Sequence, residues 1–332
     1  MNKLSAHTLK RIGALLLPIL VALPQYAVAQ NSGGAYPARP IRLIALSSPG
    51  SGPDIMGRLI AARLLDAWGQ AVVVDTRPGA SGIIGTEIAA RAAPDGHTLV
   101  IITSQAAIVS AMYSNLNYDL VRDFSPISLM GTTPFLLVVH PSVPAKSVSE
   151  LIQHVKSRPG ALRYGSGGSG SPPHLCAEIL KSMTGMNIQH IPYKSVTPAM
   201  TDTIAGEVQM LISVIPAVLS TVKSGKLRAL GVTSAKRTPI VPDLPAIAET
   251  VAGYEFIGWY SVFAPAKTPK AIIDKLNGEL VKAAQSPDMR SRLATIGVDA
   301  LGSDVPTLAA YLPQQIAKMA DAVKMSGAKV DR

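Results

Sequence analysis

Short apolar runs alternate with segments of helical period along most of the chain. The run IRLIAL at Ile41–Leu46 is typical of a buried strand. Asp54–Trp68 then carries apolar residues at positions 55, 56, 59, 60, 64, 65 and 68, which is a helical period, and Gly69 is placed to end the helix. The same order continues with a strand at Ala71–Asp75, a helix at Ile83–Ala92 and a strand at Thr98–Thr103. This βαβαβ order predicts a parallel sheet with helices on both faces.

A second alternating set begins near Phe135. Its strands are predicted at residues 135–140, 162–164, 188–193, 208–213 and 227–233, with helices at 147–157, 174–183, 198–205 and 217–223. A long aromatic-rich strand at Gly253–Pro265 follows. Three further helices are predicted to begin at Thr268-Pro269, with an N-cap and an N1 proline, at Ser286-Pro287 and near Val305.

The segments near 132–139 and 255–264 look like strands that cross between these two α/β units. We therefore predict domain 1 at residues 36–131 plus 256–332 and domain 2 at residues 132–255, with a ligand cleft between them. The chain is also longer than the size at which one hydrophobic core usually divides into two.

The first residues have the pattern of a secretory signal peptide. Lys3, Lys10 and Arg11 precede the apolar run Ile12–Leu23, and an A-x-A site ends at Ala29. The run is shorter than the ~20 apolar residues of a membrane span. We predict cleavage after Ala29, which removes residues 1–29 and exports the remaining chain.

Charge and cysteine content narrow the function classes. Removal of the three basic residues of the leader lowers the formal net charge from +10 to +7, and the remaining charges are dispersed. No basic run with interleaved aromatic residues is present, so a nucleic-acid partner is not expected. Cys176 is the only cysteine, which rules out an intrachain disulfide, and its apolar surroundings predict a buried position.

Small hydroxyl residues and glycines recur in the loops that connect strands to helices. The five loops are Ser47–Asp54, Arg77–Gly82, Thr103–Gln105, Tyr164–His174 and Pro192–Pro198. In parallel sheets, ligands bind beyond the carboxyl ends of the strands, where unpaired helix N–H groups attract anions. The five loops together favour an anion-binding cleft, with Asp54 capping the helix that follows the first loop.

The fourth loop contains a literal G-x-G-x-x-G at Gly165, Gly167 and Gly170. A dinucleotide site would need an acidic residue ~20 positions later, and the sequence around position 190 is NIQHIPYK, without an acid. We therefore reject a nicotinamide cofactor. The sequence also contains no G-x-S-x-G, no phosphate-binding P-loop, no close metal pair of histidines and no paired carboxylates. This pattern argues against an enzyme, and we expect neither a cofactor nor a metal.

Taken together, the loop sequences resemble one family. The stretches YPARPIRLIALSSPGSGPD, RPGASG, APDGHTLVI, GSGGSGSPPHL, HIPYKSVTPAM and GWYSVFAPAKTP closely resemble the Bordetella uptake gene (Bug) family, the periplasmic solute-binding proteins of tripartite tricarboxylate transporters. The resemblance covers nearly all of the chain after the leader. It implies a Venus-flytrap fold of two α/β domains, joined by two crossover strands, that closes over a small carboxylate.

The resemblance also implies where the ligand binds. Contacts are expected from backbone amides and hydroxyls of facing loops, with bridging waters. The residues expected at the site are Ser47, Ser48, Pro49, Gly50, Ser51, Gly52, Asp54 and Ser104 from the first domain, and Ser166, Gly167, Ser169, Ser171, Tyr193 and Ser213 from the second.

The chain departs from the family pattern at several of these loops. It has Pro49-Gly50-Ser51 in place of P-G-G and Pro192–Ser195 in place of P-Y-K-G, and Ser213 stands where many members carry an aspartate. An aspartate there could pair with an ammonium group, so Ser213 favours a plain carboxylate over an amino acid. The ligand class implied is a dicarboxylate, a tricarboxylate or an aromatic carboxylate.

The resemblance implies a monomer that delivers its ligand to the membrane subunits of a tripartite transporter. An alternative is a sensor module that presents the ligand to a membrane signalling protein such as a sensor kinase. The residues of the binder do not separate these two roles.

Overall fold

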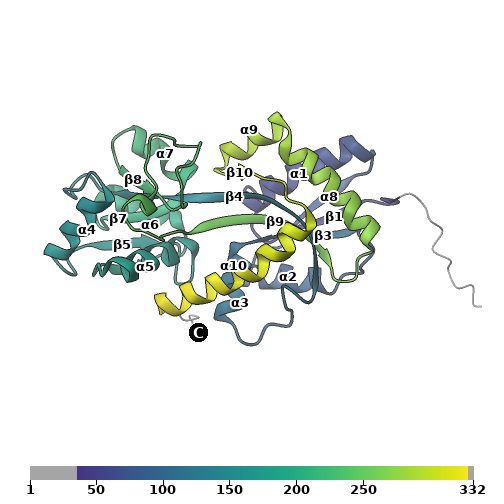
Figure 1. Ribbon diagram of the computed structural model, residues 1–332, viewed down its shortest axis with the longest axis horizontal. Coiled ribbons are helices and arrows are strands. Elements are labelled where there is room, and N and C mark those ends of the chain that lie inside the picture. Colours follow the sequence, from purple (N-terminus) through teal and green to yellow (C-terminus); the bar gives the residue numbers. More distant parts are fainter. Residues whose placement is uncertain (1–35, 328–332) are drawn as a thin grey trace, which may run out of the picture. The chain divides into compact units, whose positions relative to one another are not determined.

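Strands and helices alternate through the computed structural model, which describes residues 36–327 (Figure 1). The predicted signal peptide lies outside the described residues. The strands are β1 (Ile41–Ala45), β2 (Val72–Thr76), β3 (Thr98–Thr103), β4 (Phe124–Val139), β5 (Arg163–Ser166), β6 (Gln189–Pro192), β7 (Met210–Val214), β8 (Arg228–Val232), β9 (Ile257–Pro265) and β10 (Asp299–Ala300). The helices are α1 (Gly52–Trp68), α2 (Ile83–Ala90), α3 (Ser104–Met112), α4 (Val148–Ser157), α5 (Pro172–Thr184), α6 (Val196–Ala205), α7 (Ile215–Lys223), α8 (Lys270–Gln285), α9 (Pro287–Thr295) and α10 (Val305–Ser326), with short 3₁₀ turns η1 (Ala80–Gly82) and η2 (Ile247–Glu249).

The first group of strands has the order β2-β1-β3-β9-β4. The strands β2, β1 and β3 are parallel, as the βαβαβ pattern predicts, whereas β9 runs antiparallel to β3 and to β4. Helices α1 and α8 contact one another on one side, and α2, α3 and α10 contact the strands separately from them. Because both faces are covered, β1 and β3 consist of almost continuously buried aliphatic residues.

The strand β4 belongs to two groups of strands. Its first part, Phe124–Pro134, pairs with β9, and its second part, Phe135–Val139, pairs with β7 and, from Leu136, with β8. Beyond β7 the order continues through β5 to β6, which are parallel to one another. The result is a mixed sheet in which β4 links the two α/β units along its length (Figure 1). The domain limits at residues 131 and 255 remain a prediction.

Several element boundaries differ from the sequence prediction. The segment Thr103–Gln105 is not a loop, because β3 ends at Thr103 and α3 begins at Ser104. The strand β4 begins at Phe124, well before Phe135. Pro126 and Pro134 obscure it, since proline argues against a strand, and the pairing with β9 shifts register beside Pro126.

Two further boundaries are corrected at the C-terminal part. The long strand begins at Ile257, not at residue 253. The next helix begins at Lys270 with Pro269 as its N-cap, because the hydroxyl of Thr268 donates to the carbonyl of Pro265, at 2.8 Å, instead of capping the helix.

The C-terminal helix α10 lies against α3, α5 and β4 (Figure 1). Tyr311 of α10 meets Trp259 of β9 edge to face, with ring centroids 6.1 Å apart, and Lys318 is paired with Glu255 at 2.5 Å. Cys176 is fully buried, as predicted. Within residues 36–327, none of the helices has both the length and the hydropathy of a membrane-spanning segment.

Candidate functional site

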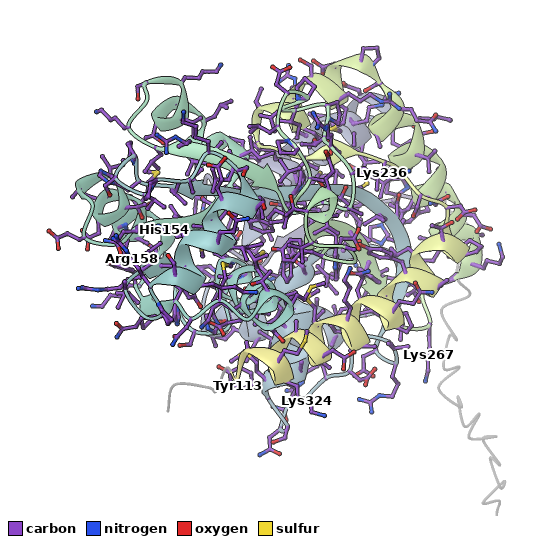
Figure 2. The ribbon with its side chains drawn as sticks, turned by 60° about the vertical axis from the view of Figure 1, so that its left-hand side comes forward. Tyr113, His154, Arg158, Lys236, Lys267 and Lys324 are labelled. Atoms are coloured by element: carbon purple, nitrogen blue, oxygen red, sulfur yellow. The ribbon has the colours of Figure 1, made fainter. Side chains whose placement is uncertain are left out.

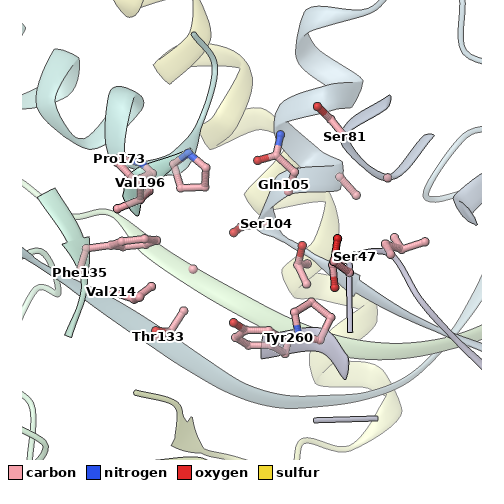
Figure 3. Close-up of a pocket in the computed structure, with 18 of the residues that line it drawn as sticks. Ser47, Ser81, Ser104, Gln105, Thr133, Phe135, Pro173, Val196, Val214 and Tyr260 are labelled. Atoms are coloured by element: carbon pink, nitrogen blue, oxygen red, sulfur yellow. The ribbon is translucent and has the colours of Figure 1, made fainter. Parts of the chain in front are cut away.

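A cavity of about 560 Å³ lies where helices of the described chain present their N-terminal ends. The first residues of α3, α5 and α6 line it, as do Pro53 of α1, Gly82 at the N-cap of α2, and Val214 and Ala217 at the start of α7. The full lining is Leu46, Ser47, Ser48, Pro53, Pro78, Gly79, Ser81, Gly82, Thr103, Ser104, Gln105, Ala106, Thr133, Phe135, Pro172, Pro173, Val196, Thr197, Met200, Ser213, Val214, Ala217, Gly258, Trp259 and Tyr260. Figure 3 shows Ser47, Ser81 and Gln105 on one side of the cavity and Phe135, Val196 and Val214 on the opposite side.

The electrostatic character of the cavity comes from the backbone. Among the described residues that line it, none is an aspartate, glutamate, lysine, arginine or histidine. Within residues 36–327, the starts of α1, α2, α3, α5, α6 and α7 have no hydrogen bond from a side-chain cap. Each helix start carries about half a positive charge and unpaired N–H groups. Their convergence favours an anion without any cationic side chain.

The loop Ser47–Asp54 forms one wall, and its own hydrogen bonds fix its shape. The hydroxyls of Ser47 and Ser51 are hydrogen-bonded, and Ser51 donates to the carbonyl of Ser48 at 2.6 Å. The carboxylate of Asp54 accepts the N–H of Gly50 at 2.8 Å and the Nε of Arg58 at 3.1 Å. Burial opposes ionisation of Asp54, but the two hydrogen bonds and the positive charge of Arg58 together lower its pKa.

Asp54 therefore holds the loop, but the prediction that it caps the helix is wrong. The N-cap of α1 is Ser51, and Asp54 lies in the first turn.

The turn before α2 has a left-handed backbone at four consecutive residues. The φ angles are 120° at Gly79, 45° at Ala80, 54° at Ser81 and 92° at Gly82. This conformation costs roughly 1 kcal/mol or more at each residue that is not glycine, and such strain concentrates at ligand sites. Gly79, Ser81 and Gly82 all line the cavity.

Three buried polar atoms in the cavity wall have no hydrogen-bond partner within residues 36–327. They are Oγ1 of Thr133, Oγ of Ser213 and Nε1 of Trp259. The residues are 4%, 0% and 1% exposed, respectively. A buried polar atom without a partner costs about 1–3 kcal/mol, so these atoms favour a ligand or water that supplies the missing bonds.

The predicted site residues divide into two sets. Four of them line the cavity, namely Ser47, Ser48, Ser104 and Ser213. The others do not line it: Pro49, Gly50, Ser51, Gly52 and Asp54 shape the first loop, and Ser166, Gly167, Ser169, Ser171 and Tyr193 lie outside the lining. Contact of any of these residues with a ligand remains a prediction.

Two of the second-domain residues outside the lining have side-chain partners elsewhere, whereas the buried Oγ of Ser171 has none within residues 36–327. Ser166 is bonded to His190 at 2.7 Å, and the hydroxyl of Tyr193 donates to Asp202 at 2.7 Å. Gly167 allows close contact, since a Cβ there would lie 3.3 Å from the backbone nitrogen of Val196. The glycine motif thus packs the loop against α6 instead of lining the cavity.

Several polar lining residues were not among the predicted contacts. Ser81, Thr103, Gln105 and Thr197 lie in loops that the sequence analysis assigned to the cleft, but they were not singled out, whereas Thr133, Trp259 and Tyr260 lie outside those loops. Thr133 and Trp259 come from β4 and β9 and gave no local signal. Burial raises the pKa of Tyr260 to about 12, so its hydroxyl stays protonated. Among residues 36–327, no group of three or more His, Cys, Asp or Glu side chains is arranged to hold a metal ion.

Comparison with known proteins identifies the family. The profile described as "Tripartite tricarboxylate transporter family receptor" matches residues 56–327. Protein BugT of Bordetella pertussis is 36% identical over 91% of this chain and 94% of its own length. A protein of Pseudomonas sp. strain P51, encoded between tcbD and tcbE, is 34% identical over 89% of this chain and 88% of its own length.

Solved structures give the same result for the fold. The R. palustris protein Rpa4515, described with adipate, has a TM-score of 0.77 and 35% identity over 89% of this chain and 99% of its own. MatC from Rhodopseudomonas palustris, described with bound malate, has a TM-score of 0.72 and 27% identity over 87% of this chain and 100% of its own. The two-domain α/β fold of periplasmic binding proteins, predicted from the sequence, is confirmed. The chain belongs to the tripartite tricarboxylate transporter receptor family, whose Bug-type members are periplasmic binding receptors for solutes and not enzymes.

Proposed function

We propose that this protein captures a small dicarboxylate or aromatic carboxylate in the cavity and delivers it to the membrane subunits of a tripartite tricarboxylate transporter. The observation that carries the proposal is the cavity itself, which has no charged side chain in its described lining and is bordered by the starts of six helices. Export with cleavage after Ala29, action in the periplasm and a monomeric state are parts of the same proposal.

A carboxylate fits these helix ends. The first N–H groups of α3 and the hydroxyls of Ser48 and Ser104 can donate to its oxygens. Several such donors hold an anion without an arginine, and water can bridge where a donor is too far. An amino acid fits less well, because the described lining offers no carboxylate to pair with its ammonium group.

One side of the cavity favours an apolar ligand body. Phe135, Met200, Val214 and Pro173 belong to the lining, and such surfaces exclude water from a methylene chain or an aromatic ring. The unpartnered hydroxyls of Thr133 and Ser213, also in the lining, are suited to a second polar group. The adipate of Rpa4515 and the malate of MatC are dicarboxylates, which supports this class.

The position of the cavity suggests how the ligand would change the protein. Its lining combines residues of the proposed domain 1, such as Ser104, with residues of the proposed domain 2, such as Ser213. A ligand that bonds to both domains binds the closed arrangement more tightly than the open one and shifts the hinge equilibrium towards it. The membrane subunits would then recognise the closed surface.

A thermal-shift screen of residues 30–332 tests the proposal. The panel contains C4–C6 dicarboxylates, citrate, benzoate- and phthalate-type aromatics, amino acids and NAD. A ligand at a hundredfold excess over its Kd stabilises the folded state by about 2.7 kcal/mol. We expect dicarboxylates or aromatic carboxylates to raise the melting temperature while amino acids and NAD leave it unchanged. The screen is repeated after unfolding and refolding to remove any co-purified solute.

Two results would contradict the proposal. One is an unchanged melting temperature with every carboxylate after refolding. The other is a shift with an amino acid that exceeds the shift with the matching dicarboxylate. Isothermal titration then measures the Kd of the best compound, and recovery of the unaltered ligand separates binding from turnover.

A further inference from the structure

Two histidine side chains stack on one another behind the glycine loop, residues 166–171. The ring centroids of His174 and His190 are 4.1 Å apart with an interplanar angle of 23°. The ring of Tyr164 stacks on His190 at 4.8 Å, so three rings form a continuous pile. His174 comes from the first turn of α5 and His190 from β6.

Each imidazole holds one end of the glycine loop. At the first end, Nε2 of His190 is hydrogen-bonded to Oγ of Ser166 at 2.7 Å, and that hydroxyl also accepts the N–H of Gly168 at 3.1 Å. At the other end, the N–H of Gly170 donates to Nδ1 of His174 at 3.1 Å. The second bond requires an unprotonated Nδ1, because a protonated ring nitrogen cannot accept.

The loop lies directly against the wall of the cavity. Pro172 and Pro173, which follow it, line the cavity. Gly167 contacts Val196, another lining residue, and Gly170 lies against Met112 at the end of α3. A shift of the loop would therefore move both the start of α5 and the cavity wall.

The groups around the stack favour neutral rings. Burial lowers the pKa of both histidines, and for His190 burial together with the neighbouring His174 lowers it to about 4. Glu178 of α5 opposes the shift and Lys181 of α5 adds to it. Glu178 accepts the hydroxyl of Tyr164 at 2.5 Å and pairs with Lys181 at 2.7 Å, so its charge is largely compensated. The helix α10, which also packs against α5, carries Lys318, Asp321 and Lys324.

We propose that His174 and His190 are positioning residues that hold the glycine loop and the start of α5 at the ligand cavity, and that this hold fails when the His174 ring is protonated. Protonation of His174 removes the acceptor of Gly170, and two imidazolium rings in this stack would repel one another. Ligand affinity then falls at acidic pH because the loop moves, although the described lining of the cavity contains no histidine or acidic side chain that titrates. The expected loss of ligand affinity rests on the proposed function, whereas the bond between His174 and the glycine loop does not.

The experiment compares the full chain from residue 30 with three variants. His174→Asn keeps an oxygen acceptor near the position of Nδ1 but does not titrate. His190→Gln keeps an amide group near Nε2 that can bond to Ser166, and it does not titrate either. His154→Gln is the control, since His154 lies on α4 at the periphery of the molecule (Figure 2). Nitrogen-15 resonances of the histidine rings and the amide resonance of Gly170 are followed from pH 8 to pH 4, with adipate affinity measured at pH 7 and pH 4.5.

We expect the Gly170 amide resonance to move in step with protonation of His174. Between pH 7 and pH 4.5, the adipate affinity of the wild-type protein should fall about five- to tenfold further than that of the His174→Asn variant. Protonation of adipate itself affects both proteins equally, so it cancels in this comparison. The His154→Gln variant should follow the wild type. Protonation of His174 with an unchanged Gly170 resonance would overturn the proposal, as would equal acid loss in the wild type and both loop variants.

The design separates this inference from the proposed function. If the Gly170 resonance follows the His174 ring but no carboxylate binds at any pH, the loop contact is supported and the proposed function fails. If carboxylates bind and the resonance does not follow the ring, the proposed function stands and the histidine inference fails.

Discussion

The substitution Ser213→Asp tests the ligand class through the charge of the cavity. Ser213 is fully buried in β7, lines the cavity and has a hydroxyl without a partner within residues 36–327. The pairing of β7 with β4 places Ser213 opposite Leu136, next to the pair of Val214 and Phe135. The variant adds a carboxylate to a lining whose described residues carry no charge.

The size of the effect follows from Coulomb's law. At ~6 Å and an effective dielectric constant of ~20, two unit charges interact by ~3 kcal/mol, which is a factor of ~100 in affinity. Repulsion should weaken adipate by about this factor while the new carboxyl is ionised. Burial raises the pKa of a carboxyl in such a place, so the loss should shrink towards acidic pH.

Isothermal titration at pH 8 with adipate and with an amino acid of similar length measures the effect. Ser213→Asn is the matched control, because it has nearly the same volume and no charge. We expect the Asp variant to bind adipate more weakly than the Asn variant does. We also expect it to bind the amino acid more tightly than the Asn variant does. Equal adipate affinity in the Asp and Asn variants would show that Ser213 does not face the ligand, and the argument from its position would be refuted.

Three further predictions concern stability. Tyr254→Phe removes a buried hydroxyl that donates to the carbonyl of Cys176 at 3.1 Å, and should cost about 1–2 kcal/mol in urea unfolding; an unchanged midpoint would contradict it. Folding lowers the pKa of His190 from its ordinary 6.5 to about 4, so the unfolded chain binds this proton more readily and the free energy of unfolding falls as pH drops from about 6.5 to about 4. Over this range the wild-type protein should therefore lose more stability than the His190→Gln variant. Parallel curves of unfolding free energy against pH for the two proteins would disprove this. Gly131→Ala places a Cβ 2.6 Å from the carbonyl oxygen of Asp299 and should lower the melting temperature by several degrees, a cost of about 1–3 kcal/mol; a melting temperature equal to the wild type's would count against this contact.

The fold was largely predictable because its signals are local. The helical period of residues 54–68 and the aliphatic run at Ile41 show, within a few residues, which side chains are buried. The spacing of the buried side chains then indicates whether the segment is a helix or a strand. The strand β4 was harder, since Pro126 and Pro134 hide a strand that only its pairing with β9 explains.

The site was less predictable because its geometry depends on distant partners. The loop Ser47–Asp54 was found from its composition, and two of its serines line the cavity. The glycine loop looked equally suited, but Ser166 is bonded to His190, twenty-four positions later, which no local pattern announces. Thr133 and Trp259 reach the cavity because of the register of β4 with β9. That register depends on both strands and cannot be predicted from the sequence of either one alone.

The late arrival of β9 has a consequence for biosynthesis. The strand β3 ends at Thr103, but its antiparallel neighbour begins only at Ile257, and β4 needs the same neighbour along its first part. A growing chain must therefore leave two hydrophobic strand edges open until most of its length has been made. We therefore expect the first sheet to be completed only after β9 has been made. If the chain is exported as proposed, this sheet would close only once residue 265 has been supplied.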